Sequence, residues 1–260
     1  MLKKPLIWRP SSRGRRLRLT LVGLILVVGL FTAVTLIRTM TDPRNQTFLR
    51  WWRGSAAERQ SLVTIQREAC PGAPFILPAD GYIGLLYGDP RGPYSRFRPH
   101  QGIDIFSPGA VGQTPVYAAY DGYVTREADW RSTLIQRVPD DPLQPGRQLW
   151  LYYTHMAHHD SGEDTIEEAF APGVRELFVP QGTLLGYTGN YNGDSPRQVG
   201  VHLHFSIVLD DGRGGYRNEL DIANTLDPSP YLGMSVHYAC APAVPSCTAN
   251  PLCPAARSGS

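Results

Sequence analysis

The longest apolar run of this 260-residue chain lies near its N-terminus. Between Arg18 and Arg38 stand 19 uncharged and mostly apolar residues, LTLVGLILVVGLFTAVTLI. Because about 20 such residues span a bilayer as a helix, we expect a transmembrane segment at residues 19–38. A cleaved signal peptide is the alternative, but its apolar region is usually only about 7–15 residues long and ends in an Ala-x-Ala-like site. No clear site of that kind follows this run.

The charge pattern predicts the orientation of this segment. Residues 1–20 hold seven basic groups and no acid. Such clusters stay on the cytoplasmic side, so we expect residues 1–18 to be cytoplasmic and the chain from residue 39 onward to be exported. The body, residues 39–260, has 17 Arg, no Lys and 23 acids. It lacks a basic stripe interleaved with aromatics, and we therefore expect no nucleic-acid partner.

Residues 39–69 are expected to be a connector that is largely helical, since the stretch 44–68 contains few Gly or Pro residues. Two adjacent tryptophans, Trp51 and Trp52, stand there between Arg50 and Arg53. Aromatic and Arg side chains are favoured at a membrane surface. A spacer that packs on the following domain is at least as good an explanation, and the sequence leaves both open.

From Cys70 onward, short runs of Val, Ile, Leu and Tyr recur between turn signals such as Asp121-Gly122 and Asn192-Gly193. Regularly spaced short strands with such turns are typical of an all-β domain. The acidic stretch 157–180 interrupts this pattern and is expected to be a long loop, with a short helix near 165–170. The predicted strands are 115–119, 122–125, 133–138, 149–155, 184–188 and 201–209.

The four cysteines form an even set in a chain that we expect to be exported, which favours disulfides over metal binding. None of them belongs to a Cys-x-x-Cys pair. Cys70 and Cys240 flank the predicted domain, so we expect a bridge between its two ends. Cys247 and Cys253 would then close a small loop in a Cys/Pro-rich tail at 234–260.

The candidate chemistry lies in a set of histidines with one aspartate. Residues i and i+2 of a strand face the same side, so His202 and His204 present both rings to one face. His100 and Asp104 precede them by about a hundred residues, and His155 ends a hydrophobic strand. Three His or carboxylate ligands and one open position are typical of catalytic zinc. A lone histidine is usually structural, and it is the conjunction of these five that indicates a site.

Four motifs carry a resemblance to a known family. In chain order they are Arg98-Pro99-His100-Gln101-Gly102-Ile103-Asp104-Ile105, Tyr153-Thr154-His155-Met156, Gly186-Tyr187-Thr188-Gly189-Asn190 and Val201-His202-Leu203-His204-Phe205. Together they resemble the LytM/lysostaphin-type zinc metallopeptidases, peptidase family M23. The similarity covers roughly residues 75–233. It implies a compact two-sheet antiparallel β-sandwich with long loops, here a peptidase domain at 70–233.

The resemblance also implies roles. His100, Asp104 and His204 match the three ligands of a single Zn²⁺, and His155 and His202 match the two catalytic histidines beside it. The expected activity is hydrolysis of peptide bonds in peptidoglycan stem peptides or cross-bridges, on the outer side of a bacterial cell membrane. The alternative is a non-catalytic member of this fold that binds the cell wall or regulates other wall hydrolases. Such members usually lack a ligand, whereas all five positions are filled here.

Two positions depart from the family pattern. Val201 stands where proline is common, and Ser206 stands where an acid is common. We expect neither to touch the metal ligands. His158 and His159 are expected to be surface histidines of the acidic loop.

Overall fold

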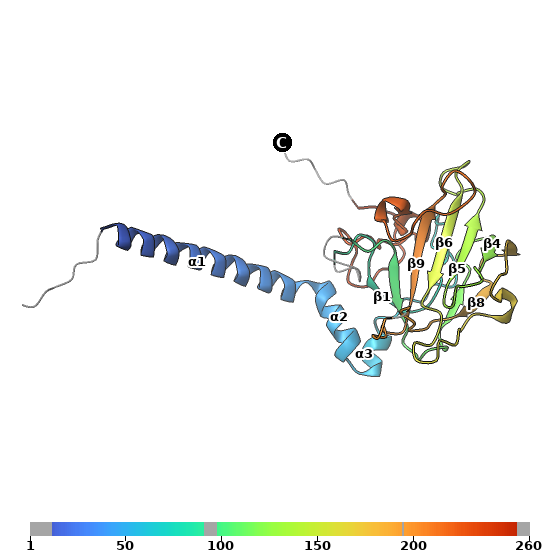
Figure 1. Ribbon diagram of the computed structural model, residues 1–260, viewed down its shortest axis with the longest axis horizontal. Coiled ribbons are helices and arrows are strands. Elements are labelled where there is room, and N and C mark those ends of the chain that lie inside the picture. The colour runs from blue at the N-terminus through green and yellow to red at the C-terminus, as the bar shows by residue number, and fades with distance from the viewer. Residues whose placement is uncertain (1–11, 91–97, 194, 254–260) are drawn as a thin grey trace, which may run out of the picture. The chain divides into compact units, whose positions relative to one another are not determined.

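A computed structural model describes residues 12–90, 98–193 and 195–253 (Figure 1). The chain divides into two compact units, residues 1–46 and 47–260. The first unit holds helix α1, Ser12–Thr41. Its segment Thr20–Ile37 has a mean hydropathy of 2.6 and no buried residue, so it is long and apolar enough to cross a membrane. A signal sequence shares that property. Within this segment the hydroxyls of Thr32 and Thr35 donate to carbonyls four residues earlier.

The expected connector forms two short helices rather than one. They are α2, Pro43–Arg53, and α3, Ala56–Gln60. The N–H of Gly54 donates to the carbonyl of Arg50 and ends α2. Ser55 then starts α3 with a capping box, in which its hydroxyl accepts from the N–H of Glu58 and the Glu58 carboxylate accepts from the N–H of Ser55.

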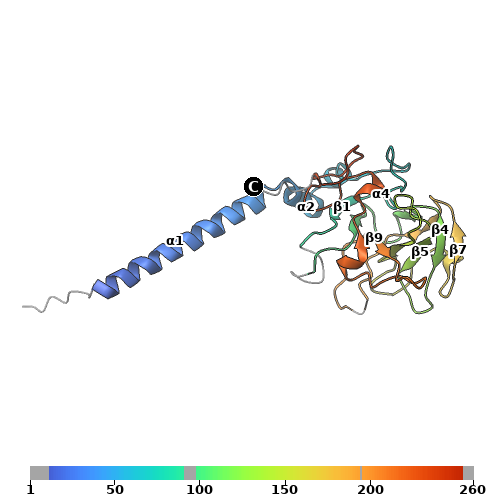
Figure 2. The same cartoon turned by 90° about the horizontal axis from the view of Figure 1, so that it is seen from above.

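The second unit is built on a large antiparallel sheet of eight strands and a small sheet of two. The large sheet has the order β1-β2-β9-β6-β5-β4-β7, with β10 also paired to β9. Figure 1 shows β9, β6 and β5 running side by side, and Figure 2 shows β7 beyond β4 at one edge. In this sheet lie β1 Tyr82–Leu85, β2 Ile103–Phe106, β4 Gly122–Thr125, β5 Leu134–Val138, β6 Leu149–Thr154, β7 Leu177–Val179, β9 His202–Leu209 and β10 Thr225–Leu226.

The small sheet pairs β3, Pro115–Tyr117, with β8, Leu184–Tyr187. Short helical turns complete the unit: η1 Glu168–Phe170, η2 Ile222–Asn224 and α4 Ser229–Leu232. All six predicted strands are confirmed within one or two residues, and the short helix expected in the acidic loop is present as η1. The strands that periodicity missed are β1, β2, β7 and β10, each only two to four residues long. Length alone does not separate them from β3, β4 and β8, which are three or four residues long and were predicted.

The main core gathers buried apolar side chains from both sheets and from the segments that connect the strands. Large side chains with no exposed surface include Phe75, Tyr153 and Phe205. Leu203 and Phe205 alternate along β9 with the two histidines, so one face of this strand is core and the other is available for a site. Residues Met234 and Val236 also belong to this core. The segment after 233 therefore begins as part of the packed unit.

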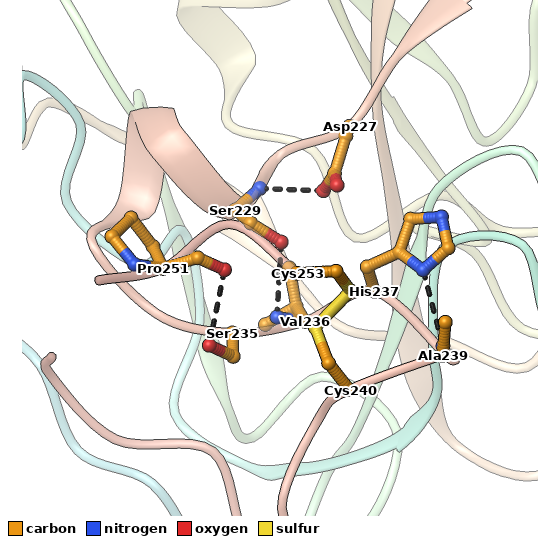
Figure 3. The surroundings of a disulfide bond; sticks show 9 residues. All are labelled: Asp227, Ser229, Ser235, Val236, His237, Ala239, Cys240, Pro251 and Cys253. Carbon is orange, nitrogen blue, oxygen red and sulfur yellow. Dashed lines mark hydrogen bonds between the residues drawn. A yellow bond between two sulfur atoms is a disulfide. The ribbon is translucent and has the colours of Figure 1, made fainter. Parts of the chain in front are cut away.

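The expected disulfide pairing is wrong. The bridges join Cys70 to Cys247 and Cys240 to Cys253. The reason is that the tail doubles back: Met234 pairs with Cys247, and the N–H of Thr248 donates to the carbonyl of Gly233. This return places Cys247, and not Cys240, beside Cys70. Figure 3 shows the second bridge, next to which the Ser235 hydroxyl donates to the carbonyl of Pro251.

The two bridges should differ in their effect on stability. Cys70–Cys247 joins residues 177 positions apart and Cys240–Cys253 joins residues 13 apart. Loop-closure entropy predicts that the longer bridge contributes about 2 kcal/mol more. We expect Cys70→Ser/Cys247→Ser to lower the unfolding midpoint of the full chain in detergent clearly more than Cys240→Ser/Cys253→Ser does. Equal midpoints for the two variants would contradict this ranking.

Candidate metal centre

The register of three central strands brings the candidate residues to one place. On β2 and β9, Asp104 lies opposite His204 and Phe106 lies opposite His202. On β6, Thr154 lies opposite His204 from the other side, and His155 follows directly. Because the side chains of paired residues stand on the same face, the face that carries His202 and His204 also carries Asp104. All three side chains are buried.

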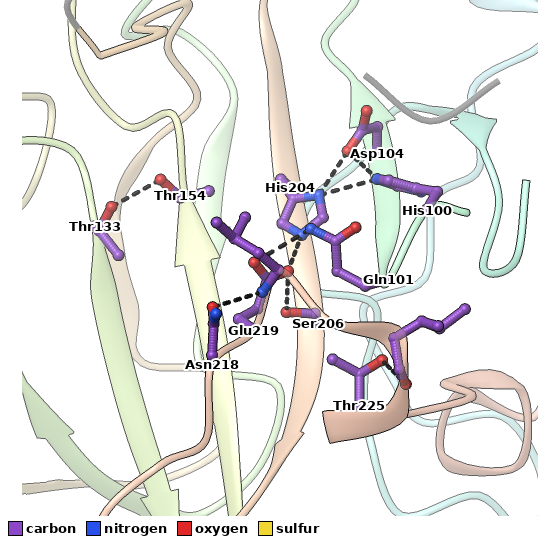
Figure 4. A network of polar contacts seen from close by, with 12 residues as sticks. His100, Gln101, Asp104, Thr133, Thr154, His204, Ser206, Asn218, Glu219 and Thr225 are labelled. Carbon is purple, nitrogen blue, oxygen red and sulfur yellow. Dashed lines mark hydrogen bonds and ion pairs between the residues drawn. The ribbon is translucent and has the colours of Figure 1, made fainter. Parts of the chain in front are cut away.

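Three donor atoms converge at the centre of this face. The Nε2 atom of His100 lies 3.1 Å from Nδ1 of His204 and 3.1 Å from Oδ1 of Asp104. The Nδ1 atom of His204 lies 2.8 Å from the same carboxylate oxygen. Figure 4 shows His204 on β9 with His100 and Asp104 facing its Nδ1 side. In the part of the chain that the structure describes, this trio is the group of His, Cys, Asp or Glu residues that could hold a metal ion.

Gly102 allows His100 to approach β9. A Cβ atom at this position would lie 2.3 Å from the carbonyl oxygen of Phe205 and 3.0 Å from the ring of His204. The first contact is with backbone, which cannot move aside without disturbing the β2–β9 pairing. The glycine of the His-x-Gly-x-Asp motif is thus required by the closeness of the two strands.

The outer nitrogen of each ligand histidine is already engaged. Nδ1 of His100 lies 3.2 Å from the carbonyl oxygen of Leu86, to which it donates. Nε2 of His204 lies 2.8 Å from Oε1 of Glu219. Such outer contacts fix the tautomer and turn the other nitrogen toward a metal. The inward atoms are then two ring nitrogens and a carboxylate oxygen, a donor set that fits Zn²⁺ with one position left for another ligand.

Glu219 is a part of this site that the sequence did not indicate. It stands in the loop after β9, 15 residues beyond His204, where no periodicity points to it. The Ser206 hydroxyl donates to Oε1 of Glu219 at 3.1 Å, and the Gln101 amide donates to Oε2 at 3.3 Å. Ser206 therefore contacts the carboxylate that holds the ligand His204, although it does not contact the ligand itself. The acid that the family pattern has after Phe205 is absent, and an acid from a distant loop contacts His204 instead.

We expect Glu219→Gln to weaken zinc binding by about 10–100-fold, the usual effect of losing such an outer carboxylate. The amide keeps the size of the side chain but removes the negative charge that holds His204. Zinc affinity measured by competition with a chromophoric chelator tests this, with Glu163→Gln in the exposed acidic loop as the control. An unchanged affinity in Glu219→Gln would show that the contact does not support the metal.

His202 and His155 lie beside the trio with their rings 4.4 Å apart between centroids. Nδ1 of His202 donates to the carbonyl of Gly200 at 2.6 Å, and Nδ1 of His155 donates to the carbonyl of Tyr191 at 2.5 Å. Each ring, while neutral, therefore keeps its Nε2 unprotonated. That of His202 lies 3.7 Å from Oδ2 of Asp104. His155 has φ of +74°, a left-handed backbone that is costly for a non-glycine residue and is found mostly at functional sites.

The electrostatics of the metal-free site separate these groups. Burial lowers the pKa of His155 to about 3, with a further contribution from neighbouring His202, and burial likewise lowers the pKa of His202. Burial alone would lower the pKa of His204 too, but Glu219 and Asp104 raise it to about 10. Burial opposes ionisation of Asp104, yet the surrounding histidines hold its pKa well below the usual range. Two neutral imidazoles thus stand beside a carboxylate that is ionised at pH 7.

Two cavities meet at the site and make a groove through it. One, of about 560 Å³, is mostly polar and is lined by residues such as Asp129, Arg131 and Thr133. The other, of about 370 Å³, is mostly apolar. His155, Asn192 and His204 line both cavities. A peptide that occupied both cavities would pass over His204 of the donor trio.

The remaining described histidines lie outside the trio. His158 and His159 stand in the acidic loop but are half-buried rather than at the surface, and the N–H of His159 donates to the side-chain oxygen of Asn190. The ring of His237 packs on Tyr87 at 5.6 Å between centroids.

No protein-family model matches the chain, and a search of curated proteins found no match. Solved structures do match. The catalytic domain of lysostaphin from Staphylococcus simulans is 19% identical with a TM-score of 0.36, over 57% of this chain and 90% of that one. The catalytic domain of a variant of the M23 protein EnpA from Enterococcus faecalis is 23% identical with a TM-score of 0.33, over 57% and 91%.

A zinc containing peptidase from Vibrio cholerae is 20% identical with a TM-score of 0.34, over 59% of this chain and 40% of that one. The chain spans 52% of a LytM protein from Ruminococcus gnavus and 46% of a longer form of lysostaphin. The TM-scores of these matches are all below 0.5.

Proposed function

We propose that this chain is a zinc metalloendopeptidase that hydrolyses peptide bonds of peptidoglycan stem peptides or cross-bridges. The observation that carries the proposal is the convergence of four buried side chains and the half-buried His155, from distant parts of the chain, at one place on the sheet. His100, Asp104 and His204 would hold the metal. His155 and His202 stand beside it: His155 lines both cavities, and His202 lines the apolar one. The peptidoglycan substrate is supported by the resemblance of the motifs to M23 peptidases.

The fit to zinc is supported by the donor set and by its outer contacts. Two imidazoles and one carboxylate leave a position open, and Leu86 and Glu219 fix the orientation of the two rings. When bound, zinc supplies a Lewis acid that polarises the scissile carbonyl and lowers the pKa of water toward neutrality.

The two flanking histidines are suited to proton transfer. Each presents an unprotonated Nε2 because its Nδ1 donates to a backbone carbonyl. Two imidazolium ions with ring centroids 4.4 Å apart would repel each other. The pair would therefore take up only one proton in addition to the two on its Nδ1 atoms. We assign the additional proton, taken from the attacking water, first to Nε2 of His202. Asp104 lies 3.7 Å from this atom and stabilises the charged ring. From the pair, the proton can pass to the leaving amine.

His155, the ring beside His202, is then placed to stabilise the negative charge that develops on the carbonyl oxygen of the substrate. While it is neutral, its Nε2 can only accept a hydrogen bond, because its proton is on Nδ1. Donation to the carbonyl oxygen therefore requires the shared proton. This arrangement makes the two histidines a unit, in which loss of either one removes the ability to hold and deliver a proton.

We further propose that the protein is anchored by α1 as a single pass, with residues 1–18 in the cytoplasm and the peptidase domain, 70–233, outside it. The apolar segment and the preceding basic residues support this topology. Two disulfides in the second unit agree with an oxidising compartment.

The experiment is digestion of purified sacculi from several peptidoglycan chemotypes by the full chain in detergent. Released peptides are identified by mass spectrometry, with and without chelator and after zinc is restored. We expect release that stops with chelator and returns with zinc. No release from any chemotype, by protein shown to contain zinc, would contradict the peptidoglycan substrate. Zinc-loaded protein that binds sacculi without cleaving them would favour the non-catalytic alternative.

A further inference from the structure

Trp52 lines the groove although it belongs to the connector and not to the sheets. It follows Trp51 on α2, and the two differ sharply in exposure. Trp51 is 4% exposed and Trp52 is 48% exposed. Trp52 borders the apolar cavity together with Asp104, His155, His202 and His204. An exposed tryptophan in contact with a groove needs an explanation, because such a side chain gains most from being covered by a ligand.

The helix that carries Trp52 is firmly packed on the domain. The ring of Trp51 lies 5.3 Å from that of Tyr82 on β1, and Phe48 lies 6.5 Å from Phe106 on β2. Trp51, Leu62, Tyr82 and Phe106 form a separate buried cluster. Residues before Trp52 (Phe48 and Trp51) and after it (Leu62) pack on the domain. These contacts fix the position of Trp52.

A chain of ring contacts connects Trp52 to the proposed proton acceptor. Trp52 meets Phe106 edge-on at 5.5 Å between centroids, and Phe106 stacks on His202 at 5.1 Å. Phe106 lies opposite His202 in the β2–β9 pairing. The wall of the groove on the His202 side is thus aromatic, and its outermost member is Trp52.

The sequence of the facing loop accommodates this ring. A Cβ atom on Gly200 would lie 2.3 Å from the Trp52 ring, and its three nearest neighbours are all atoms of that ring. Gly200 is also the residue whose carbonyl accepts the hydrogen bond from His202. Absence of a side chain at position 200 therefore lets Trp52 lie against the segment that orients His202.

We propose that Trp52 is a substrate-binding residue that forms the outer apolar wall of the groove on the His202 side. This inference rests on the proposed function. It adds the kind of peptide side chain that binds beside the metal, which the proposed function does not specify. The Trp52 side would take an apolar side chain or methyl group of the peptide. The opposite cavity, with Asp129 and Arg131, would take polar or charged groups. The connector thus belongs to the substrate site as well as to the link with α1.

The test uses the full chain in detergent and soluble cross-linked muropeptide dimers released from sacculi by a glycosidase. We expect Trp52→Ala to raise KM about tenfold with little change in kcat, as the loss of one aromatic contact predicts. Zinc content should not change, the unfolding midpoint should fall only by the loss of the ring contact with Phe106, and Trp52→Phe should recover part of the loss in KM. Leu49→Ala is the matched control, since Leu49 is exposed on the same helix and lines neither cavity.

Gly200→Ala supplies an independent arm. Its methyl group should displace Trp52 and raise KM in the wild-type background, yet have no further effect when Trp52→Ala is already present. Calorimetric binding of the dimer to zinc-loaded His202→Ala protein should weaken about tenfold on adding Trp52→Ala, a result that does not depend on turnover. Wild-type affinity and KM in Trp52→Ala would overturn the inference. Failure of the wild-type protein to cleave any dimer would instead count against the proposed function.

Discussion

Alanine at position 204 is expected to deprive the protein of zinc and of activity together. His204 is the central member of the trio, with Nδ1 at 2.8 Å from Asp104 and Nε2 at 2.8 Å from Glu219. Its removal takes away one of three ligands and leaves two buried carboxylates without their shared partner. We expect zinc to fall from about one atom to below about 0.1 per chain after dialysis, since losing even an outer contact costs 10–100-fold in affinity.

Elemental analysis of the dialysed protein measures this, together with peptide release from sacculi. His158→Ala is the matched control, because His158 stands in the acidic loop outside the trio. The control should keep its zinc and its activity. Full zinc in His204→Ala would rule out His204 as a ligand and with it the proposed centre.

Alanine at position 202 is expected to separate metal binding from turnover. The ring of His202 lies beside the trio, with Nε2 at 3.7 Å from Asp104, and is not one of the three converging donors. Loss of a positioned proton acceptor typically lowers the rate by about 10²–10⁴-fold. We therefore expect His202→Ala to retain its zinc and lose activity by about that factor. His155→Ala should behave in the same way.

The double variant gives the sharper result. If the two histidines hold one shared proton, His155→Ala/His202→Ala should be little worse than either single variant, because residues that act as a unit are not additive. Multiplication of the two single effects would show that each ring acts alone. Equal zinc loss in His202→Ala and His204→Ala would contradict the division of roles along β9.

The strand periodicity of the sequence was sufficient to place the two histidines of β9 on one face and Leu203 and Phe205 in the core. The long strands β6 and β9 each give several alternations, and both were predicted nearly to the residue. The five candidate residues were found because the motifs around them have fixed composition and order. What brings them together, the pairing of β2 and β6 with β9, could not be predicted, since the periodicity of a strand does not say which strand lies beside it.

Contacts between distant loops were missed for a different reason. Glu219 reaches His204 from a loop without periodicity, and its hydrogen bond to Ser206 is visible only once both strand and loop are placed. The sequence left the two tryptophans of the connector open between a membrane surface and a packed spacer. The structure buries Trp51 against Tyr82 and sets Trp52 at the groove. The cysteine pairing failed because spacing along the chain says nothing of a tail that doubles back.

One zinc ion is expected to bind where His100, Asp104 and His204 converge. Anomalous diffraction from crystals of the protein, recorded on both sides of the zinc absorption edge, tests it most directly. We expect a single strong peak in contact with Nε2 of His100, Nδ1 of His204 and a carboxylate oxygen of Asp104. A zinc peak at another group of residues, or none in protein that cleaves sacculi, would contradict the account.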